Sequence, residues 1–203
     1  MDPVNLQLVF ATNNQHKLKE IKSMLNGTPT IMSLKDIDCL DELPETSSSL
    51  RGNAIQKARY VFEKYGVNCF ADDTGLEIVA LNGRPGVYSA RFAGLQASDS
   101  DNVAKVLNEM KGIENRKATF KTVIALITDR EEKSFEGMIE GEITKEPRGT
   151  AGFGYDPVFL PSGSSKTFAE MNEAEKNSMS HRSRALDKLI SYLKEAYAFN
   201  KAN

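Results

Sequence analysis

The stretch Cys69-Phe70-Ala71-Asp72-Asp73-Thr74-Gly75-Leu76 decides how we interpret this chain. Small and apolar residues lead to two adjacent carboxylates, and a hydroxyl and a glycine follow, which is how a strand commonly ends in a turn. We therefore predict a strand that stops here, followed by a short second strand over residues 77–81. Successive side chains of a strand point to opposite faces, so only one of Asp72 and Asp73 can face a given pocket before the turn begins.

Two carboxylates at the end of a strand have two interpretations. Mg²⁺ prefers carboxylate oxygen ligands, so the pair suits a divalent cation and an activated water. Alternatively, the residues form an acidic turn that only ends the strand and caps the next element. The choice between the two depends on the residues that the rest of the chain supplies.

Composition restricts the class of protein. The chain has 203 residues, of which 40% are hydrophobic and 27% are charged, and its formal net charge is −2. This length suits one full domain, with room for two lobes. A near-neutral balance without a basic block argues against nucleic acid as the main ligand. No apolar run is long enough to span a membrane and no signal-peptide pattern is present, so we expect a soluble, cytoplasmic protein.

The residue types also restrict the kind of metal site. Cys39 and Cys69 are too few for a disulfide framework, and His16 and His181 are the only histidines. A zinc site built from His and Cys would lack ligands. We therefore expect any metal in this protein to be bound by oxygen atoms.

The N-terminal segment predicts a phosphate-binding turn. Residues 6–11 predict a strand, a polar turn follows over residues 12–17, and a helix begins near Lys17 with Leu18, Ile21 and Leu25 on its apolar face. Backbone N–H groups and the helix dipole attract an oxyanion at such a point, and Lys17 adds a full positive charge. The glycine-rich pattern of an ordinary P-loop is missing.

Further helices and strands follow along the chain. We predict a loop over residues 33–50, which by its acidic composition is solvated and mobile. The remaining elements are helices over residues 51–65 and 99–110, a helix that starts near residues 181–182, and strands over residues 120–128 and 135–143 that form a hairpin.

The segment Gly149-Thr150-Ala151-Gly152-Phe153-Gly154-Tyr155-Asp156-Pro157 brackets two aromatic rings with glycines. Glycine lets the backbone approach a flat ligand closely while the rings stack on it. The alternative is a glycine-rich connector whose aromatic rings join the core.

Three cations gather at the start of the last helix. Lys176, His181 and Arg182 place positive charge where the helix dipole is already positive. That arrangement is unfavourable unless an anion joins it. It therefore indicates a phosphate or another electronegative ligand group.

Together these motifs resemble the inosine/xanthosine triphosphate pyrophosphatase family, whose members hydrolyse deaminated purine nucleoside triphosphates to the monophosphate and pyrophosphate. The resemblance covers nearly the whole chain, through residues 12–17, 53–58, 71–76, 85–91, 152–157 and 176–182. The family usually has glycine at the position of Asn13 and commonly serine at that of Thr74. Asn tolerates left-handed backbone angles, and Thr74 keeps the hydroxyl, so both departures are compatible with the activity.

The resemblance implies an α/β fold: an elongated two-lobed domain over residues 1–203, with a long mixed twisted sheet flanked by helices and a central cleft. It also implies a homodimer that acts on a small-molecule nucleotide, with ITP, dITP, XTP and dXTP as substrates and Mg²⁺ as cofactor. Neither nucleic acid nor a membrane is an expected partner.

The resemblance further assigns roles to individual residues. Asp73 corresponds to the general base and a metal ligand, Glu45 to a second metal carboxylate, and Asp72 to a group that assists. Substrate-binding roles fall on Thr12, Asn13, Asn14, Gln15, His16 and Lys17 for the phosphates, on Thr74, on Phe153, Gly154, Tyr155 and Asp156 for the base, and on Lys176, His181 and Arg182 for the 6-oxo group or a nearby phosphate.

Two rival functions remain open on the sequence alone. A pyrophosphatase of related fold that acts on pyrimidine or modified nucleotides, the septum-formation inhibitor type, would begin its first motif with a serine-proline-arginine turn, which residues 12–17 lack. A regulatory module that senses a triphosphate without cleaving it would gain only repulsion from Asp72 and Asp73. Release of pyrophosphate from ITP separates catalysis from sensing.

Overall fold

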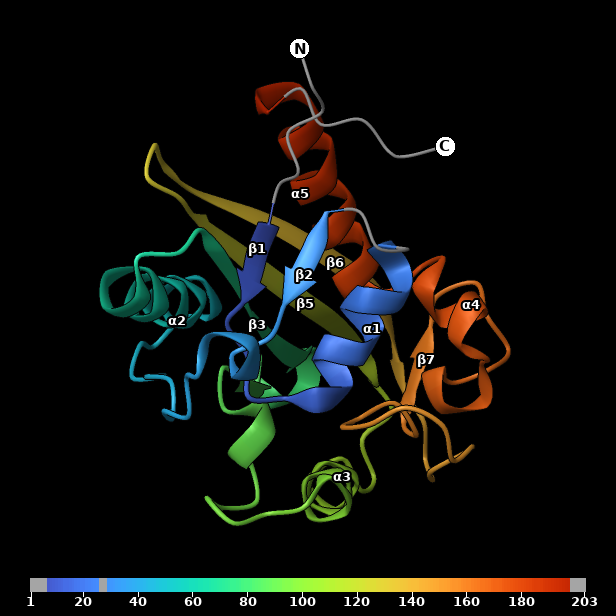
Figure 1. Cartoon of the computed structure of the whole chain (residues 1–203). Coiled ribbons are helices and arrows are strands. Elements are labelled where there is room, and N and C mark those ends of the chain that lie inside the picture. Colours follow the sequence, from blue (N-terminus) through green and yellow to red (C-terminus); the bar gives the residue numbers. More distant parts are fainter. Residues whose placement is uncertain (1–6, 26–28, 198–203) are drawn as a thin grey trace. The chain divides into compact units, whose positions relative to one another are not determined.

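The computed structural model describes residues 7–25 and 29–197 (Figure 1). Helices and strands alternate along the chain: β1 (Gln7–Phe10), α1 (Gln15–Leu25), β2 (Thr30–Met32), α2 (Leu50–Tyr65), β3 (Cys69–Ile78), β4 (Pro85–Gly86), α3 (Asp99–Glu109), β5 (Lys117–Ile127), β6 (Glu132–Ile143), β7 (Phe159–Pro161), α4 (Glu173–Asn177) and α5 (His181–Ala196). Short 3₁₀ turns lie at Lys35–Ile37, Val79–Leu81, Ser89–Arg91 and Phe168–Glu170.

The strands form one mixed sheet in the order β2-β1-β3-β5-β6-β7, and β4 pairs with β3 outside this path. Strand β1 is parallel to both β2 and β3, with Leu8 opposite Ile31 and Val9 opposite Cys69. Strands β4 and β7 are antiparallel to β3 and β6. The predicted α/β class with a mixed sheet and flanking helices is therefore confirmed.

The chain divides into two compact units. Unit 1 comprises Met1–Asp73, Val123–Gly137 and Ser183–Asn203, and unit 2 comprises Thr74–Thr122 and Met138–Arg182. Strands β3, β5 and β6 each begin in one unit and end in the other. The single two-lobed domain and the central cleft stay predictions.

In unit 1 the alternation of strand side chains builds two separate hydrophobic clusters. Leu8, Phe10 and Phe70 pack with α1 and α5, where the Phe10 and Phe70 rings stack at 4.7 Å between centroids. Val9 and Ala71 pack instead with α2. Figure 1 shows α2 on one side of β1 and β3, and α1 and α5 on the other. Residues of even and odd number in these strands therefore meet different helices.

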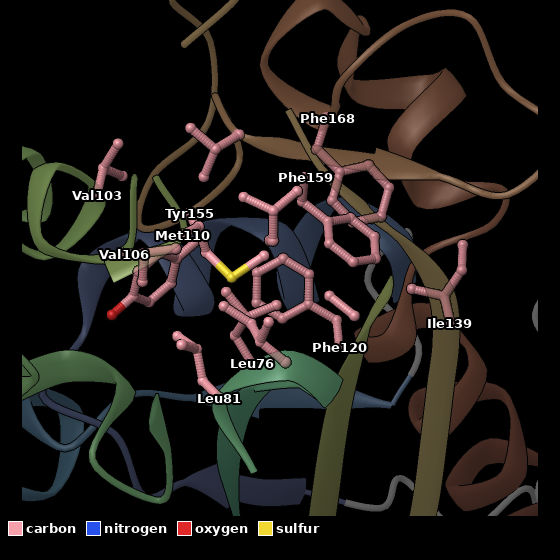
Figure 2. Close-up of a cluster of buried hydrophobic side chains, with 14 of the residues drawn as sticks. Leu76, Leu81, Val103, Val106, Met110, Phe120, Ile139, Tyr155, Phe159 and Phe168 are labelled. Atoms are coloured by element: carbon pink, nitrogen blue, oxygen red, sulfur yellow. The ribbon is translucent and has the colours of Figure 1, made fainter. Parts of the chain in front are cut away.

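Unit 2 has a core of its own, in which aromatic rings dominate (Figure 2). Phe120 lies with its ring centroid 4.6 Å from that of Phe159 and 6.2 Å from that of Phe168. The apolar face of α3, including Val103 and Val106, closes the cluster. One face of α3 and residues of β5 thus contribute to the core of unit 2.

Local signals set the helix ends. The Ser49 side chain accepts a hydrogen bond from the N–H of Gly52 at the start of α2, and Gly66 ends that helix with a φ of 65°. Ser98 and Asp101 form a capping box at the start of α3. The predicted helices 51–65 and 99–110 are thereby confirmed within one residue.

The structure corrects the prediction for the central stretch. Strand β3 continues through Asp72, Asp73, Thr74 and Gly75 to Ile78, and a 3₁₀ turn replaces the second strand predicted over residues 77–81. The backbone runs on because β3 lies between β1 and β5 in the sheet and also pairs with β4 at Leu76, and a local pattern cannot reveal these partners. The acidic pair therefore lies inside a strand and does not end one.

Other differences are smaller. Helix α1 begins at Gln15, before Lys17, and β5 begins at Lys117. The short elements β2, β7 and α4 were not predicted, because three to five residues carry too little periodicity. Residue 6 of the first predicted strand lies outside the described residues. Across the described ranges, no helix is long and apolar enough to cross a membrane.

Candidate active site

The two carboxylates of β3 point to opposite faces of the strand. Asp72 follows Phe70 in the alternation and meets α1, whereas Asp73 follows Ala71 and meets α2. The expectation that only one of them can face a given pocket is confirmed by these partners. Two neighbouring aspartates thus have different surroundings and different chemistry.

Asp72 forms an ion pair with Lys17. Its two oxygens lie 3.1 Å from the Lys17 Nζ, and the carboxylate is fully buried. Lys17 is half-buried, in the first turn of α1. A buried carboxylate needs such a counter-charge because the interior solvates it poorly. Lys17 therefore has a structural partner in this protein as well as its predicted phosphate role.

The predicted phosphate-binding turn is capped by its own side chains. Thr12 Oγ1 accepts the N–H of Asn14, and Asn14 Oδ1 accepts the N–H of Lys17 at 3.1 Å. Thr12 is buried, whereas Asn13, Asn14, Gln15 and His16 are exposed. The turn thus holds a helix start with several polar side chains in solvent, as a phosphate site requires.

Asp73 lies in a polar cluster with α2. Its Oδ2 accepts a hydrogen bond from Asn53 Nδ2 at 3.0 Å, and its Oδ1 lies 4.0 Å from the Lys57 Nζ. The Asp73 residue is 7% exposed and Lys57 is 5% exposed. Burial raises the pKa of Asp73 above its usual value, although the charges of Lys57 and Lys17 oppose that effect.

Glu45 joins the same cluster from the loop before α2. Its Oε1 accepts a hydrogen bond from the Lys57 Nζ at 2.5 Å. One ammonium therefore contacts Glu45 and approaches Asp73, which brings the two predicted metal ligands together. The loop is tied down further, because Asp41 accepts hydrogen bonds from Lys64 and from the Tyr65 hydroxyl. The side chains of α2 thus hold the segment that we predicted to be a solvated loop.

The donor set of this cluster fits a hard cation that also binds phosphate. Within the described ranges, no group of three or more His, Cys, Asp or Glu side chains is arranged to hold a metal ion. Mg²⁺ commonly takes only one or two carboxylates from the protein, and substrate phosphates and water complete its coordination. Glu45 and Asp73 match that smaller requirement.

In unit 2 the predicted base-binding segment is organised by Asp156. Its Oδ2 accepts hydrogen bonds from the Lys176 Nζ at 2.6 Å and from the N–H of Phe153 at 2.9 Å. A Cβ at Gly152 would lie 2.0 Å from that same oxygen, so the loop requires glycine there. The carboxylate thus fixes both the glycine-rich loop and the lysine.

The two aromatic rings of this segment have different environments. Tyr155 is buried in the core of unit 2, and its hydroxyl donates to the carbonyl of Ser89 at 2.8 Å (Figure 2). Phe153 is half-buried, and the Lys176 Nζ lies 4.9 Å from its ring centroid. Tyr155 therefore follows the alternative of a ring that joins the core, and Phe153 is the ring that can stack on a ligand.

His181 and Arg182 lie at the start of α5, as predicted, and are buried. The His181 ring stacks on Phe120 at 4.5 Å between centroids. Arg182 is 1% exposed, lies over the Phe153 ring at 5.5 Å and donates to the Thr74 hydroxyl at 3.3 Å. The prediction that these cations await an external anion is weakened, because Lys176 lies in α4 and already pairs with Asp156.

Sequence reasoning missed the roles of Asn53 and Lys57. Both lie within a stretch that carries the family resemblance, but no role was given to either. Their spacing of four residues on a predicted helix placed them on one face, which was the available signal. The partner of this face is Asp73, which lies twenty residues after Asn53 along the chain and accepts its hydrogen bond.

Comparison with known proteins identifies the family. The model of the Ham1 family matches residues 8–192 of this chain. The chain belongs to the Ham1 family. Every predicted site residue, from Thr12 to Arg182, falls inside the matched range.

The Ham1 family assignment agrees with similar whole proteins. The chain is 52% identical over 188 residues to a dITP/XTP pyrophosphatase from Flavobacterium johnsoniae. The aligned region covers 93% of this chain and 98% of the relative. It is also 51% identical over 189 residues to a dITP/XTP pyrophosphatase from Flavobacterium psychrophilum, where the aligned region covers 93% of this chain and 100% of the relative. The solved structure of a Ham1 protein from Coxiella burnetii matches with a TM-score of 0.86 and 40% identity over 94% of this chain and all of that one.

Proposed function

We propose that this protein hydrolyses deaminated purine nucleoside triphosphates, ITP and dITP together with XTP and dXTP, to the monophosphate and pyrophosphate. The observation that carries the proposal is the buried cluster of Asp73, Lys57 and Glu45 in a chain of the Ham1 family. Relatives that share half of the sequence over nearly the whole chain are named dITP/XTP pyrophosphatases.

Asp73 is the group that activates water in this proposal. The attacking water gives its proton to the Asp73 carboxylate as its oxygen bonds to one phosphorus of the α–β anhydride, and the bond from that phosphorus to the bridging oxygen breaks. Lys57 lies beside this carboxylate and supplies positive charge where the transition state spreads negative charge. A raised Asp73 pKa makes the carboxylate a stronger base than an exposed aspartate.

Mg²⁺ is the proposed cofactor, held by Glu45 and Asp73. When bound, the ion would neutralise phosphate charge as a Lewis acid. Lys17, with the capped turn of residues 12–17, is the proposed site for the triphosphate oxygens. Phosphoryl transfer depends on positioning and on charge neutralisation, which these groups can supply.

The residues of unit 2 are the proposed base-reading groups. Selection of hypoxanthine and xanthine requires donors aimed at a 6-oxo group, because adenine presents an amino donor at that position. Lys176, His181 and Arg182 are such donors, and Phe153 offers a ring for stacking. Thr74 contacts Arg182, and Asp156 holds both Lys176 and the loop of Gly154. Tyr155 has an indirect role in this proposal, because its ring packs in the core that supports this loop.

We also propose that the chain acts as a cytoplasmic homodimer, each copy being one two-lobed domain. The family resemblance supports this assembly. Sedimentation of the purified protein at micromolar concentration tests it, with twice the mass of the 22.4 kDa chain as the expected result.

A substrate panel tests the proposed reaction directly. Pyrophosphate release is measured with Mg²⁺ for ITP, dITP, XTP, the standard nucleotides and modified pyrimidine nucleotides. We expect kcat/KM for the deaminated purines to exceed that for ATP by at least about 10²-fold, since site donors left unpaired by an amino group cost affinity. Tight ITP binding without pyrophosphate release would indicate a sensor, and preference for pyrimidines would indicate the related pyrophosphatase.

A further inference from the structure

Asn53 connects the two predicted metal ligands from within α2. Its side chain is fully buried and makes two hydrogen bonds with different partners. Nδ2 donates to Asp73 Oδ2 at 3.0 Å, and Oδ1 accepts the backbone N–H of Ser47 at 2.8 Å. Ser47 lies two residues after Glu45, so one amide bridges β3 to the segment that presents Glu45.

The orientation of this amide is set by its partners. A carboxylate oxygen can only accept and a backbone N–H can only donate, so the reversed amide would oppose like groups at both ends. Asn carries its donor and its acceptor on two separate atoms, so it can bond Asp73 and Ser47 at the same time. Aspartate in its place would keep the bond to Ser47 and lose the donor to Asp73.

We propose that Asn53 is a positioning residue for catalysis, which orients the Asp73 carboxylate and sets the distance of the Glu45 segment from it. This inference rests on the proposed function, because Asn53 can position catalytic groups only if Asp73 and Glu45 act together in the reaction. The bond to Oδ2 fixes the carboxylate plane, and Oδ1 is the oxygen that approaches Lys57. Mutation of groups that orient metal ligands in this way commonly lowers activity or metal affinity by roughly 10- to 100-fold.

Gln56 provides a matched control on the same helix. Its Oε1 accepts the N–H groups of Thr46 and Ser47 at 3.0 and 3.2 Å, and its Nε2 donates to Thr46 Oγ1 at 2.9 Å. Gln56 thus holds the Glu45 segment through these bonds. The variant Gln56→Ala weakens the segment alone, whereas Asn53→Asp disrupts the contact with Asp73 and keeps the bond to Ser47.

The first experiment compares kcat and KM for ITP in the full-length holoenzyme. We expect Asn53→Asp and the apolar, similarly sized Asn53→Leu to lower kcat by at least about tenfold, with KM changed less than about threefold. Gln56→Ala should lower kcat less than either Asn53 variant, because the Asp73 carboxylate keeps its hydrogen bond from Asn53. A kcat near the wild-type value in Asn53→Leu would overturn the proposal.

A double-mutant cycle with Asp73→Asn separates positioning from general support of the fold. If Asn53 acts through Asp73, Asn53→Leu should lower kcat much less in the Asp73→Asn background than in the wild type. Melting of the metal-free proteins gives a second readout, in which Asn53→Leu should lower Tm less in the Asp73→Asn background than in the wild type. Full additivity in both readouts would mean that Asn53 only supports the fold.

The same cycle distinguishes failure of the inference from failure of the proposed function. Activity of Asp73→Asn near the wild-type level would remove Asp73 from the mechanism and with it the proposed reaction scheme. A large loss in Asp73→Asn, together with wild-type kcat in both Asn53 variants, would leave the proposed function intact and overturn the role of Asn53 alone.

Discussion

The polar clusters of unit 1 and unit 2 differ in their balance of carboxylates and cations. In unit 1 two carboxylates, Asp73 and Glu45, lie near the ammonium of Lys57. In unit 2 two cations, Lys176 and Arg182, lie against the ring of Phe153, and the Asp156 carboxylate pairs with Lys176. Among these named groups, carboxylates outnumber cations in the first cluster and cations outnumber carboxylates in the second.

This difference indicates a division of work. An excess of carboxylate suits a divalent cation and a base, whereas buried donors beside an aromatic ring suit recognition of a flat, electronegative ligand. Substitutions in the cluster of Asp73, Glu45 and Lys57 should therefore change the rate of the chemical step, and substitutions in the cluster of Lys176 and Arg182 should change ligand choice and stability. Metal removal and substitutions in each unit test that contrast.

Removal of divalent metal should abolish hydrolysis, the largest effect expected. Pyrophosphate release from ITP should fall to background in excess EDTA and return with Mg²⁺, because two carboxylates and a triphosphate repel one another without a cation. The Tm of the protein in EDTA without nucleotide, compared with its Tm in Mg²⁺, provides the control for an intact fold. Full activity in EDTA would contradict the metal site at Glu45 and Asp73.

Asp73→Asn should lower kcat by at least about 10²-fold, because a base and a metal ligand are lost together. Its stability should change in the opposite direction. Since burial raises the pKa of Asp73 in the folded protein, ionisation opposes folding as pH rises from the unfolded-state value through the folded-state value. A neutral Asn avoids that cost.

Melting curves of the metal-free proteins check this sign. At neutral pH the Tm of Asp73→Asn should equal or exceed that of the wild type, and the difference should shrink as pH falls toward the ordinary aspartate range. A much lower Tm at neutral pH would mean that the ionised carboxylate stabilises unit 1.

Lys176→Met should destabilise unit 2 by about 3 kcal/mol, because it leaves the buried Asp156 carboxylate without the ammonium that pairs with it. Lys166→Met removes an ion pair with Glu175 that is largely exposed, and it should change the free energy of unfolding much less, because solvent screens exposed charges. Urea unfolding measures both.

The double variant Lys176→Met with Asp156→Asn tests the cause. It should recover part of the lost free energy of unfolding, because no unpaired charge remains in the core. No recovery would show that Lys176 contributes through packing over Phe153.

Lys17→Met should raise KM for ITP by about tenfold, which corresponds to the loss of one charge-assisted contact of about 1.4 kcal/mol. Because Lys17 also pairs with the buried Asp72, the variant should lose stability as well. Adding Asp72→Asn should restore Tm but not KM. If the double variant also regains the wild-type KM, the turn of residues 12–17 has no direct part in phosphate binding.

Much of the fold was accessible from the pattern of residues. The apolar faces of α1, α2, α3 and α5 repeat at helical spacing, and α2 carries its own stop signal at Gly66. The continuation of β3 was not accessible, because Asp-Asp-Thr-Gly has the composition of a turn and pairing with neighbouring strands, β5 and β4 among them, keeps β3 extended.

The candidate site, like the fold, has features that the sequence predicted and contacts that only the structure reveals. Residue types by themselves predicted oxygen ligands for a metal and a phosphate-binding turn at residues 12–17, whereas the role of Asp73 was implied by the family resemblance. They predicted one environment for Lys176, His181 and Arg182, but Lys176 pairs with Asp156 and His181 stacks on Phe120. These contacts join residues far apart along the chain, which local composition does not encode.

Sequence alone determined that two adjacent carboxylates follow an apolar segment in this protein. Strand pairing decided that both lie in an extended segment, where alternation sends their side chains to opposite faces. Tertiary structure decided which carboxylate does which task. Asp72 meets Lys17 because its face of β3 packs on α1, and Asp73 meets Asn53 and Lys57 because its face packs on α2. The identity of a side chain sets the chemistry available to it, and its buried neighbours set the charge state and orientation in which that chemistry occurs.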